Sequence, residues 1–148
     1  MFMRVANTIA EAAANIMSEG NQLMRRRGRV VIVDDDPAVC GSLKFSLELE
    51  GFAVRTYGSG AELLHAGDFA GCDCFVVDQR MPGMSGMELI ARLQEQEPST
   101  PAILIISHPS PALSARAAKA GVPIVEKPFL SNTLVEKIRE FCQRGEKS

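Results

Sequence analysis

The sequence predicts an α/β fold in which a parallel sheet is covered by helices on both faces. Short runs rich in Val, Ile and Leu alternate with stretches whose apolar residues recur at helical spacing. The runs are almost continuously apolar, as expected for buried parallel strands joined by right-handed crossovers. With 148 residues and 46% hydrophobic content, the chain is long enough for one domain with a substantial core and too short to favour two.

Five segments are predicted to be strands because they are short, apolar and rich in β-branched residues. The first, RVVIV, is followed directly by Asp34. Proline lies on both sides of the fourth, at Pro101 and Pro109, which limits its extent. The predicted strands are 29–33, 52–56, 74–77, 102–107 and 123–127.

A helix is predicted after each strand, and the first three begin at a capping residue. Asp36 is the expected N-cap of the first helix, because Pro37 follows at the first helical position, and Gly51 ends that helix. Ser59 and Ser85 are the expected N-caps of the second and third helices. The four later helices are predicted at 59–66, 85–96, 114–121 and 131–144.

The composition excludes several broad classes of partner. A formal net charge of −2 gives no general attraction to nucleic acid or to an anionic membrane, so we expect no direct nucleic-acid binding. No apolar run approaches the roughly 20 residues that cross a bilayer, and the N-terminus lacks the zones of a signal peptide. We therefore expect a cytoplasmic protein with no membrane attachment.

The four cysteines are expected to act as small buried hydrophobic residues. Their spacing fits neither a CxxC pair nor a disulfide framework in a chain with this much core. They are Cys40, Cys72, Cys74 and Cys142.

Unusual polar residues gather at the carboxyl ends of the predicted strands, which is where open α/β sheets bind ligands. Asp34 and Asp35 follow the first strand, Asp78 follows the third, Ser107 ends the fourth and Lys127 ends the fifth. Carboxylates this close repel one another and raise each other's pKa unless a cation intervenes. Three oxygen-only donors suit Mg²⁺, which commonly recruits a phosphate. A hydroxyl and an ammonium facing that cation are what a phosphoryl group needs.

Four segments, VVIVDDDP, FVVDQRMPGMSGMELI, LIIS and VEKPF, resemble the receiver domain of two-component response regulators, close to the subgroup with a DxRMPxMSG loop. The resemblance covers about residues 29–144, and it implies a flavodoxin-like sheet with strand order 2-1-3-4-5. The chain then divides into an N-terminal extension at 1–28, helical or disordered, a receiver domain at 29–144 and a tail at 145–148.

The resemblance implies a magnesium site beside the phosphoacceptor. Asp78 would be both phosphoacceptor and metal ligand, Asp35 a direct ligand, and Asp34 a ligand acting through water. The main-chain carbonyl of Arg80 would be the remaining protein ligand.

The resemblance also implies how a phosphoryl group is received and sensed. Asp78 would take it from a sensor histidine kinase, a phosphotransfer protein or a small phosphodonor, so we expect a signalling domain rather than an enzyme. Ser107 would sense the phosphoryl group, Lys127 would pair with its oxygens, and the bond from Lys127 to Pro128 would be cis. We expect the ammonium to contact only the added group, so that Lys127→Ala leaves folding and Mg²⁺ binding intact.

Two positions depart from the family's usual pattern. Ile124 stands where an aromatic switch residue is common, and His108 stands where a small residue is usual. Both departures permit an alternative, a degenerate receiver that acts as a phosphorylation-independent docking module. Pro82, Gly83 and Gly86 are expected only to shape a turn.

Two other classes of protein, a phosphatase and a flavin-binding protein, fit the sequence less well. Asp34 and Asp36 have the DxD spacing of a haloacid-type phosphatase, but Pro37 follows at once and Asp78 would have no role. An FMN-binding flavodoxin-like protein needs a Ser/Thr/Gly-rich phosphate loop after the first strand, where aspartates would repel phosphate.

The two ends of the chain lie outside the resemblance. Only GEKS follows the last helix, so phosphorylation is read by an unknown downstream protein, or the polypeptide is a fragment of a longer regulator. The extension is either a frayed leader or an amphipathic helix that docks or forms a homodimer. Its apolar residues recur at helical spacing: Val5, Ile9, Ala12 or Ala13, Ile16 and Met17.

Overall fold

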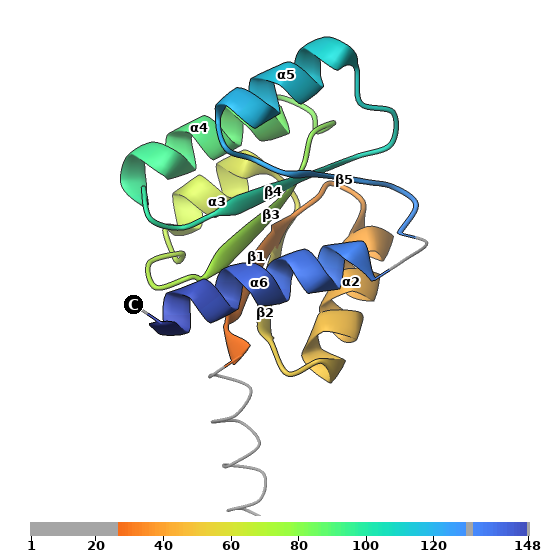
Figure 1. Cartoon of the computed structure of the whole chain (residues 1–148). Coiled ribbons are helices and arrows are strands. Elements are labelled where there is room, and N and C mark those ends of the chain that lie inside the picture. The colour runs from red at the N-terminus through yellow and green to blue at the C-terminus, as the bar shows by residue number, and fades with distance from the viewer. Residues whose placement is uncertain (1–26, 130–131, 148) are drawn as a thin grey trace, which may run out of the picture.

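Five parallel strands form one sheet in the order β2-β1-β3-β4-β5, which confirms the predicted fold class and strand order (Figure 1). The computed structural model describes residues 27–129 and 132–147, so the predicted helix in the N-terminal extension lies outside the described residues. The strands are β1 (Arg29–Val33), β2 (Ala53–Tyr57), β3 (Cys74–Asp78), β4 (Ala102–Ile106) and β5 (Ile124–Glu126).

Helices cover both faces of the sheet (Figure 1). One face is covered by α2 (Pro37–Leu49) and α6 (Thr133–Lys147), and the other by α3 (Gly60–Ala66), α4 (Gly86–Gln96) and α5 (Pro111–Lys119). Each strand is followed by a helix, as the alternating pattern predicted.

Alternate residues of the three central strands, β1, β3 and β4, enter two separate hydrophobic cores. In β1, Val30 and Ile32 pack with α2 and α6, whereas Val31 and Val33 pack with α3, α4 and α5. All four are at most 4% exposed, and full burial of such a side chain stabilises the fold by about 1.5–3 kcal/mol. The continuous apolar runs in the sequence reflect this two-sided burial.

The predicted N-caps are confirmed. The Asp36 carboxylate accepts a hydrogen bond from the Ala38 N–H at 2.9 Å. The hydroxyls of Ser59 and Ser85 likewise accept from main-chain N–H groups three residues further on. These caps fix where α2, α3 and α4 begin and hence the course of the loops before them.

The predicted start of the fourth helix was wrong. We expected it at residue 114, but α5 begins at Pro111 with Ser110 as its N-cap, whose hydroxyl accepts from the Leu113 N–H at 3.1 Å. Serine followed by proline is a strong start signal, and the Ala-rich run after it had drawn the prediction too far along the chain.

Several strand boundaries also differ by a residue or two from the prediction. β2 begins at Ala53 because the N–H of Phe52 bonds to the Leu47 carbonyl at the end of α2. β5 is shorter than predicted, since its first expected residue, Pro123, has no N–H to donate. β4 ends at Ile106, so Ser107 lies just beyond the strand.

The four cysteines are buried, as expected, and none of them takes part in a disulfide. Burial raises the pKa of the Cys72 thiol from 9.0 to about 11 and raises the pKa of Cys74 well above its ordinary value. Within residues 27–129 and 132–147, no helix is long and apolar enough to span a membrane.

Candidate functional site

Three carboxylates converge at the carboxyl ends of two neighbouring strands. Oxygen atoms of Asp34, Asp35 and Asp78 lie within 4.8 Å of one another. The cause is the sheet register: Val33 of β1 lies beside Val77 of β3, so the next residue of each strand, Asp34 or Asp78, reaches the same edge. Asp34 and Asp78 are buried, whereas Asp35 is exposed.

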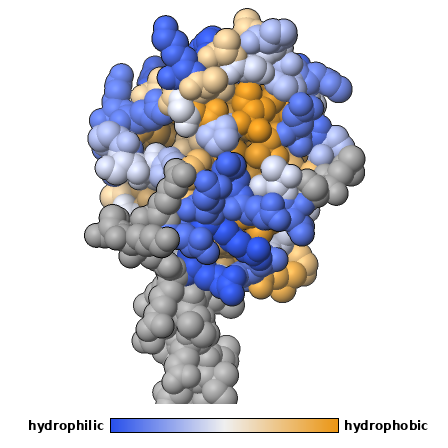
Figure 2. Space-filling model, in the orientation of Figure 1, coloured by the Kyte–Doolittle hydropathy of each residue, from blue (hydrophilic) through white to orange (hydrophobic). Residues whose placement is uncertain are grey.

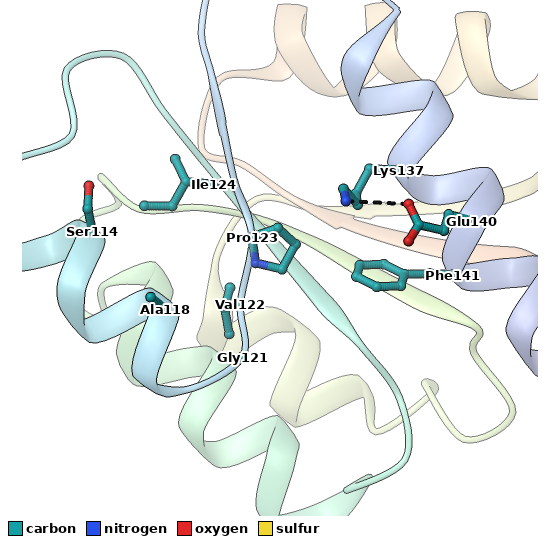
Figure 3. A pocket seen from close by; sticks show the side chains of 9 residues that line it. All are labelled: Ser114, Ala118, Gly121, Val122, Pro123, Ile124, Lys137, Glu140 and Phe141. Carbon is teal, nitrogen blue, oxygen red and sulfur yellow. Dashed lines mark hydrogen bonds and ion pairs between the residues drawn. The ribbon is translucent and has the colours of Figure 1, made fainter.

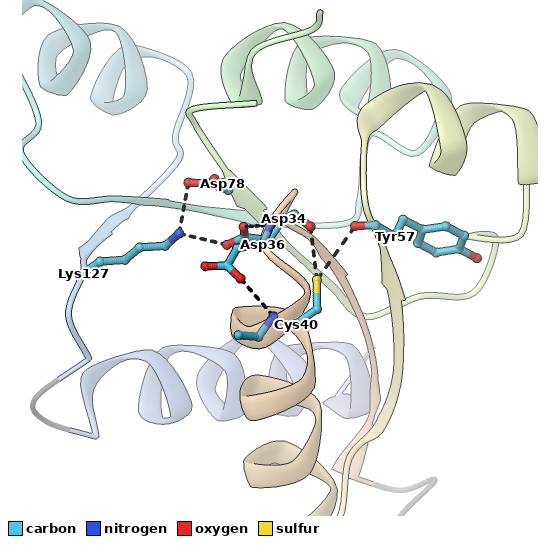
Figure 4. A network of polar contacts seen from close by, with 7 residues as sticks. Asp34, Asp36, Cys40, Tyr57, Asp78 and Lys127 are labelled. Atoms are coloured by element: carbon cyan, nitrogen blue, oxygen red, sulfur yellow. Dashed lines mark hydrogen bonds and ion pairs between the residues drawn. The ribbon is translucent and has the colours of Figure 1, made fainter. Parts of the chain in front are cut away.

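Lys127 lies against the two buried carboxylates (Figure 4). Its ammonium nitrogen is 2.9 Å from Oδ2 of Asp34 and 3.4 Å from Oδ1 of Asp78. The Lys127 N–H bonds to the Ile106 carbonyl, so the residue continues the β5 ladder into the site. The expectation that Lys127 contacts only an added phosphoryl group was therefore wrong: buried carboxylates already attract it.

These contacts shift two pKa values. Burial and then the neighbouring Asp34 charge raise the pKa of the Asp78 carboxyl, against the lowering effect of Lys127. Burial alone would lower the pKa of the Lys127 ammonium, but its hydrogen bond to Asp34 and the charges of Asp78 and Asp34 outweigh burial and raise that pKa. Lys127 is therefore held as a cation at neutral pH.

The donor set fits a hard divalent cation. Three carboxylates and one ammonium leave a net charge of −2 in the cluster, and every available ligand atom is oxygen, as Mg²⁺ prefers. The main chain of Arg80 also reaches the cluster, because its N–H donates to the Asp78 carboxylate. Asp35, which is exposed, offers oxygens on the solvent side.

The position of Asp34 is fixed by main-chain groups and a thiol for which the sequence predicted no such role (Figure 4). Its N–H donates to the Tyr57 carbonyl at 3.1 Å, and its carbonyl accepts from the Cys40 thiol at 3.2 Å. Its Oδ1 accepts from the Asp36 N–H at 2.9 Å. Asp36 therefore caps α2 and also orients Asp34 through its own main chain.

The loop after Asp78 is held by Gln79, which the sequence analysis missed. Its carbonyl accepts from the Gly86 N–H at 3.0 Å, and its side-chain Oε1 accepts from the Met87 N–H at 2.9 Å. Both donors are N–H groups in the first turn of α4, where the helix itself offers them no acceptor. No periodic or charge pattern in the sequence marks such a contact; only the position of Gln79 directly after an apolar strand hints at it.

Gly86 does more than shape a turn, which corrects the earlier expectation. A Cβ atom at this position would lie 2.6 Å from the main-chain oxygen of Asp78 and 2.8 Å from Cα of Gln79. Only glycine lets the first turn of α4 pack this closely on the end of β3. Gly83, by contrast, has a φ of 81° and does occupy a turn conformation that favours glycine.

The remaining predicted positions lie around the cluster. Ser107 is half-buried directly after β4, and His108 is exposed. Ile124 is half-buried against the core beneath α3, α4 and α5. The bond between Lys127 and Pro128 is cis, as the resemblance implied.

A separate pocket of about 490 Å³ lies between α5, β5 and α6 and shares no residue with the carboxylate cluster (Figure 3). Val122, Ile124 and Phe141 line its apolar part, and Lys137 and Glu140 form an ion pair at its side. In Figure 2 hydrophobic surface is visible between α5 and α6, the two helices that contribute to this pocket.

Comparison with known proteins identifies the family. The sequence model of the response regulator receiver domain matches residues 30–139. The transcriptional regulatory protein FixJ of Bradyrhizobium diazoefficiens is 33% identical over 83% of this chain and 60% of its own length. The C4-dicarboxylate transport transcriptional regulatory protein DctR of Rhodobacter capsulatus is 39% identical over 72% of this chain and 56% of its own.

The chain thus spans less than two thirds of the length of these two regulators. Among solved structures, a CheY-like response regulator receiver domain protein from Methanospirillum hungatei JF-1 superposes with a TM-score of 0.74 at 30% identity, covering 81% of this chain and 97% of that one. The matched range includes the carboxylate cluster and Lys127. The chain therefore belongs to the response regulator receiver domain family of two-component signalling systems.

Proposed function

We propose that this receiver domain accepts a phosphoryl group on Asp78 in a Mg²⁺-dependent reaction and thereby switches a protein-binding surface. The observation that carries the proposal is the position of Lys127, whose ammonium lies 3.4 Å from an oxygen of Asp78 and 2.9 Å from Asp34. A carboxylate nucleophile beside a fixed cation, with two further carboxylates at hand, is suited to receive a phosphoryl group.

In the proposed step, an oxygen of the ionised Asp78 forms a bond to phosphorus. The bond from phosphorus to the histidine nitrogen of a sensor kinase or phosphotransfer protein breaks, and its electron pair stays on that nitrogen. Bound Mg²⁺ would be held by Asp35, Asp78, the Arg80 carbonyl and, through water, Asp34, and would neutralise charge on the phosphoryl oxygens. Lys127 neutralises further charge, and the Gln79 contacts keep the loop after Asp78 in place.

In the proposed mechanism, β5 transmits the phosphorylation of Asp78 to the pocket between α5 and α6. This strand begins at Ile124, which lines the pocket between α5 and α6, and Lys127 follows directly after its last residue (Figure 3). An acyl phosphate on Asp78 would draw Lys127 away from Asp34, and Ser107 would donate to the new group. A shift of Lys127 would therefore reach the pocket through three strand residues, and a downstream protein that binds there would sense it.

Intact-mass measurement tests the proposal. The protein is incubated with Mg²⁺ and acetyl phosphate, and we expect a labile phosphoryl adduct that is absent from Asp78→Asn. The same adduct in Asp78→Asn would show that a residue other than Asp78 is the phosphoacceptor. Absence of any adduct at saturating donor would favour the alternative, a receiver that docks without phosphorylation, which the Ile124 and His108 departures permit.

A further inference from the structure

The outer face of α2 carries an apolar surface that the proposed phosphotransfer does not use. Phe45 is 66% exposed and Leu49 is 73% exposed, and among the described residues these are the large hydrophobic side chains that face solvent. They are four residues apart on one helix, so they lie one above the other on the same side. We call these two residues the α2 face.

Arg27, the first residue that the structure describes, lies close to the C-terminal end of α2. A Cβ atom on Gly51 would lie 2.6 Å from Cδ of Arg27, so the Arg27 side chain lies directly over Gly51, two residues beyond Leu49. Figure 2 shows hydrophobic surface at the lower right, where Figure 1 places α2. Residues 1–26 therefore join the described part of the chain close to the end of the helix that carries the α2 face.

Charge favours the same placement. The last turn of α2 contains no basic residue, although a helix C-terminus carries partial negative charge that cations stabilise. Glu48 adds a negative charge there. The C-cap residue Glu50 pairs with Arg139 of α6, whereas Glu48 forms no ion pair with any described residue. The extension contains Arg25 and Arg26, so it carries further positive charge that would suit Glu48.

The sequence of the extension has a matching apolar stripe, and its reach is sufficient. The stripe ends at Met17, ten residues before Arg27, and ten residues span up to about 33 Å. The distance along α2 from Phe45 to its C-terminal end is only about 6 Å, because a helix rises about 1.5 Å per residue.

We propose that the apolar stripe of residues 5–17 packs on the α2 face of its own molecule. Two exposed side chains are too few to anchor an interface of the roughly 1,000 Å² that a separate partner needs. A tethered segment needs a smaller buried area than a separate partner, because its effective concentration is in the millimolar range. The α2 face is therefore an intramolecular docking site for the extension.

A tryptophan reporter in the full chain tests this placement. The natural sequence has no Trp, so Phe45→Trp creates a single fluorophore on the α2 face. We expect its acrylamide quenching constant to be about threefold lower than in the same chain carrying Ile9→Glu and Ile16→Glu. The reason is that covering by the extension would reduce the exposed fraction of this side chain from 66% to about 20%. A matched control, Asn7→Glu with Ser18→Glu, adds the same charge on the opposite side of the stripe and should keep the fluorophore protected.

Two results would overturn the proposal. Equal quenching in all three chains would show that nothing covers the α2 face. Protection that is lost on dilution, with a dimeric mass by light scattering, would show that a second copy supplies the covering segment. Neither result depends on phosphorylation of Asp78, so the test is independent of the proposed function.

Discussion

Lys127 donates a hydrogen bond of 2.9 Å to Asp34 across 93 residues of sequence. The side chain of Asp34 is 1% exposed and that of Lys127 is 18% exposed, so the pair is largely removed from water. The ammonium therefore helps to hold the buried carboxylates of the site together before any phosphoryl group is present.

Lys127→Ala is accordingly expected to destabilise the fold, in contrast to the expectation from sequence. Removing one partner of a buried ion pair leaves the other charge uncompensated, and we expect the free energy of unfolding to fall by about 2–4 kcal/mol. Urea denaturation in metal-free buffer measures this loss. Lys119→Ala, at an exposed position of α5, is the matched control and should change stability by less than about 0.5 kcal/mol. Equal midpoints for the two variants would show that the Lys127 contacts contribute no stability.

Asp35→Ala is expected to have opposite effects with and without Mg²⁺. Without the cation, removing one of three mutually repelling carboxylates should leave stability unchanged or raise it slightly. With Mg²⁺, the wild type should gain stability by ligand linkage, about 1.4 kcal/mol for each tenfold excess over Kd, and Asp35→Ala should not. Thermal melts at several Mg²⁺ concentrations measure both effects, with Glu95→Ala as the control. A variant that responds to Mg²⁺ as the wild type does would remove Asp35 from the metal site.

Gly86→Ala is expected to destabilise the domain and to impair phosphorylation together. The added Cβ would lie 2.6 Å from the main-chain oxygen of Asp78, so either α4 or the end of β3 must shift. Gly41→Ala is the matched control, because a Cβ at that helical position meets no atom within 4 Å and should stabilise α2 by about 0.5–1 kcal/mol. Urea midpoints and the initial rate of adduct formation are the measurements. Normal values of both for Gly86→Ala would contradict the close packing.

The stability of the protein is expected to fall as the pH rises above 9. The Cys72 thiol has a pKa of about 11 in the folded protein, raised by burial from 9.0. Below pH 9 the Cys72 thiol is protonated in both the folded and the unfolded chain, and its contribution to stability is complete. Between pH 9 and 11 the thiol loses its proton only in the unfolded chain, so the free energy of unfolding falls. Between pH 8 and 10.5 this thiol should account for about 2 kcal/mol of lost stability. Cys72→Ala should show a smaller loss over the same range in urea titrations, and an identical loss would contradict this assignment.

Much of the fold follows from local sequence patterns. Apolar runs predicted all five strands, and the side chains of Asp36, Ser59 and Ser85 marked three helix starts because capping is a local interaction. The missed start at Ser110 was also written locally, as a serine before proline. The start of β5 was also encoded locally, because the proline before it has no N–H to donate. The start of β2 depends on whether the Phe52 N–H pairs with the end of α2 or with the neighbouring strand, which an apolar run alone does not decide.

The site could be predicted in part for the same reason. Strand ends can be read from sequence, so the meeting of Asp34, Asp35, Asp78 and Lys127 was foreseen. The direct bond from Lys127 to Asp34 was not, because it depends on the charge balance of the folded cluster. The contacts of Gln79 and the close approach at Gly86 depend on how α4 packs on β3, and this packing leaves no periodic signal.

The most direct test of the central proposal locates the phosphoryl group on the chain. The protein is incubated with Mg²⁺ and acetyl phosphate, treated with borohydride, which reduces an acyl phosphate to the alcohol, and digested for peptide mass spectrometry. The proposal predicts homoserine at residue 78 and unmodified aspartate at residues 34 and 35, with no conversion when the donor is omitted. Homoserine at residue 34 or 35, with residue 78 unmodified, would contradict the assignment of Asp78 as the phosphoacceptor.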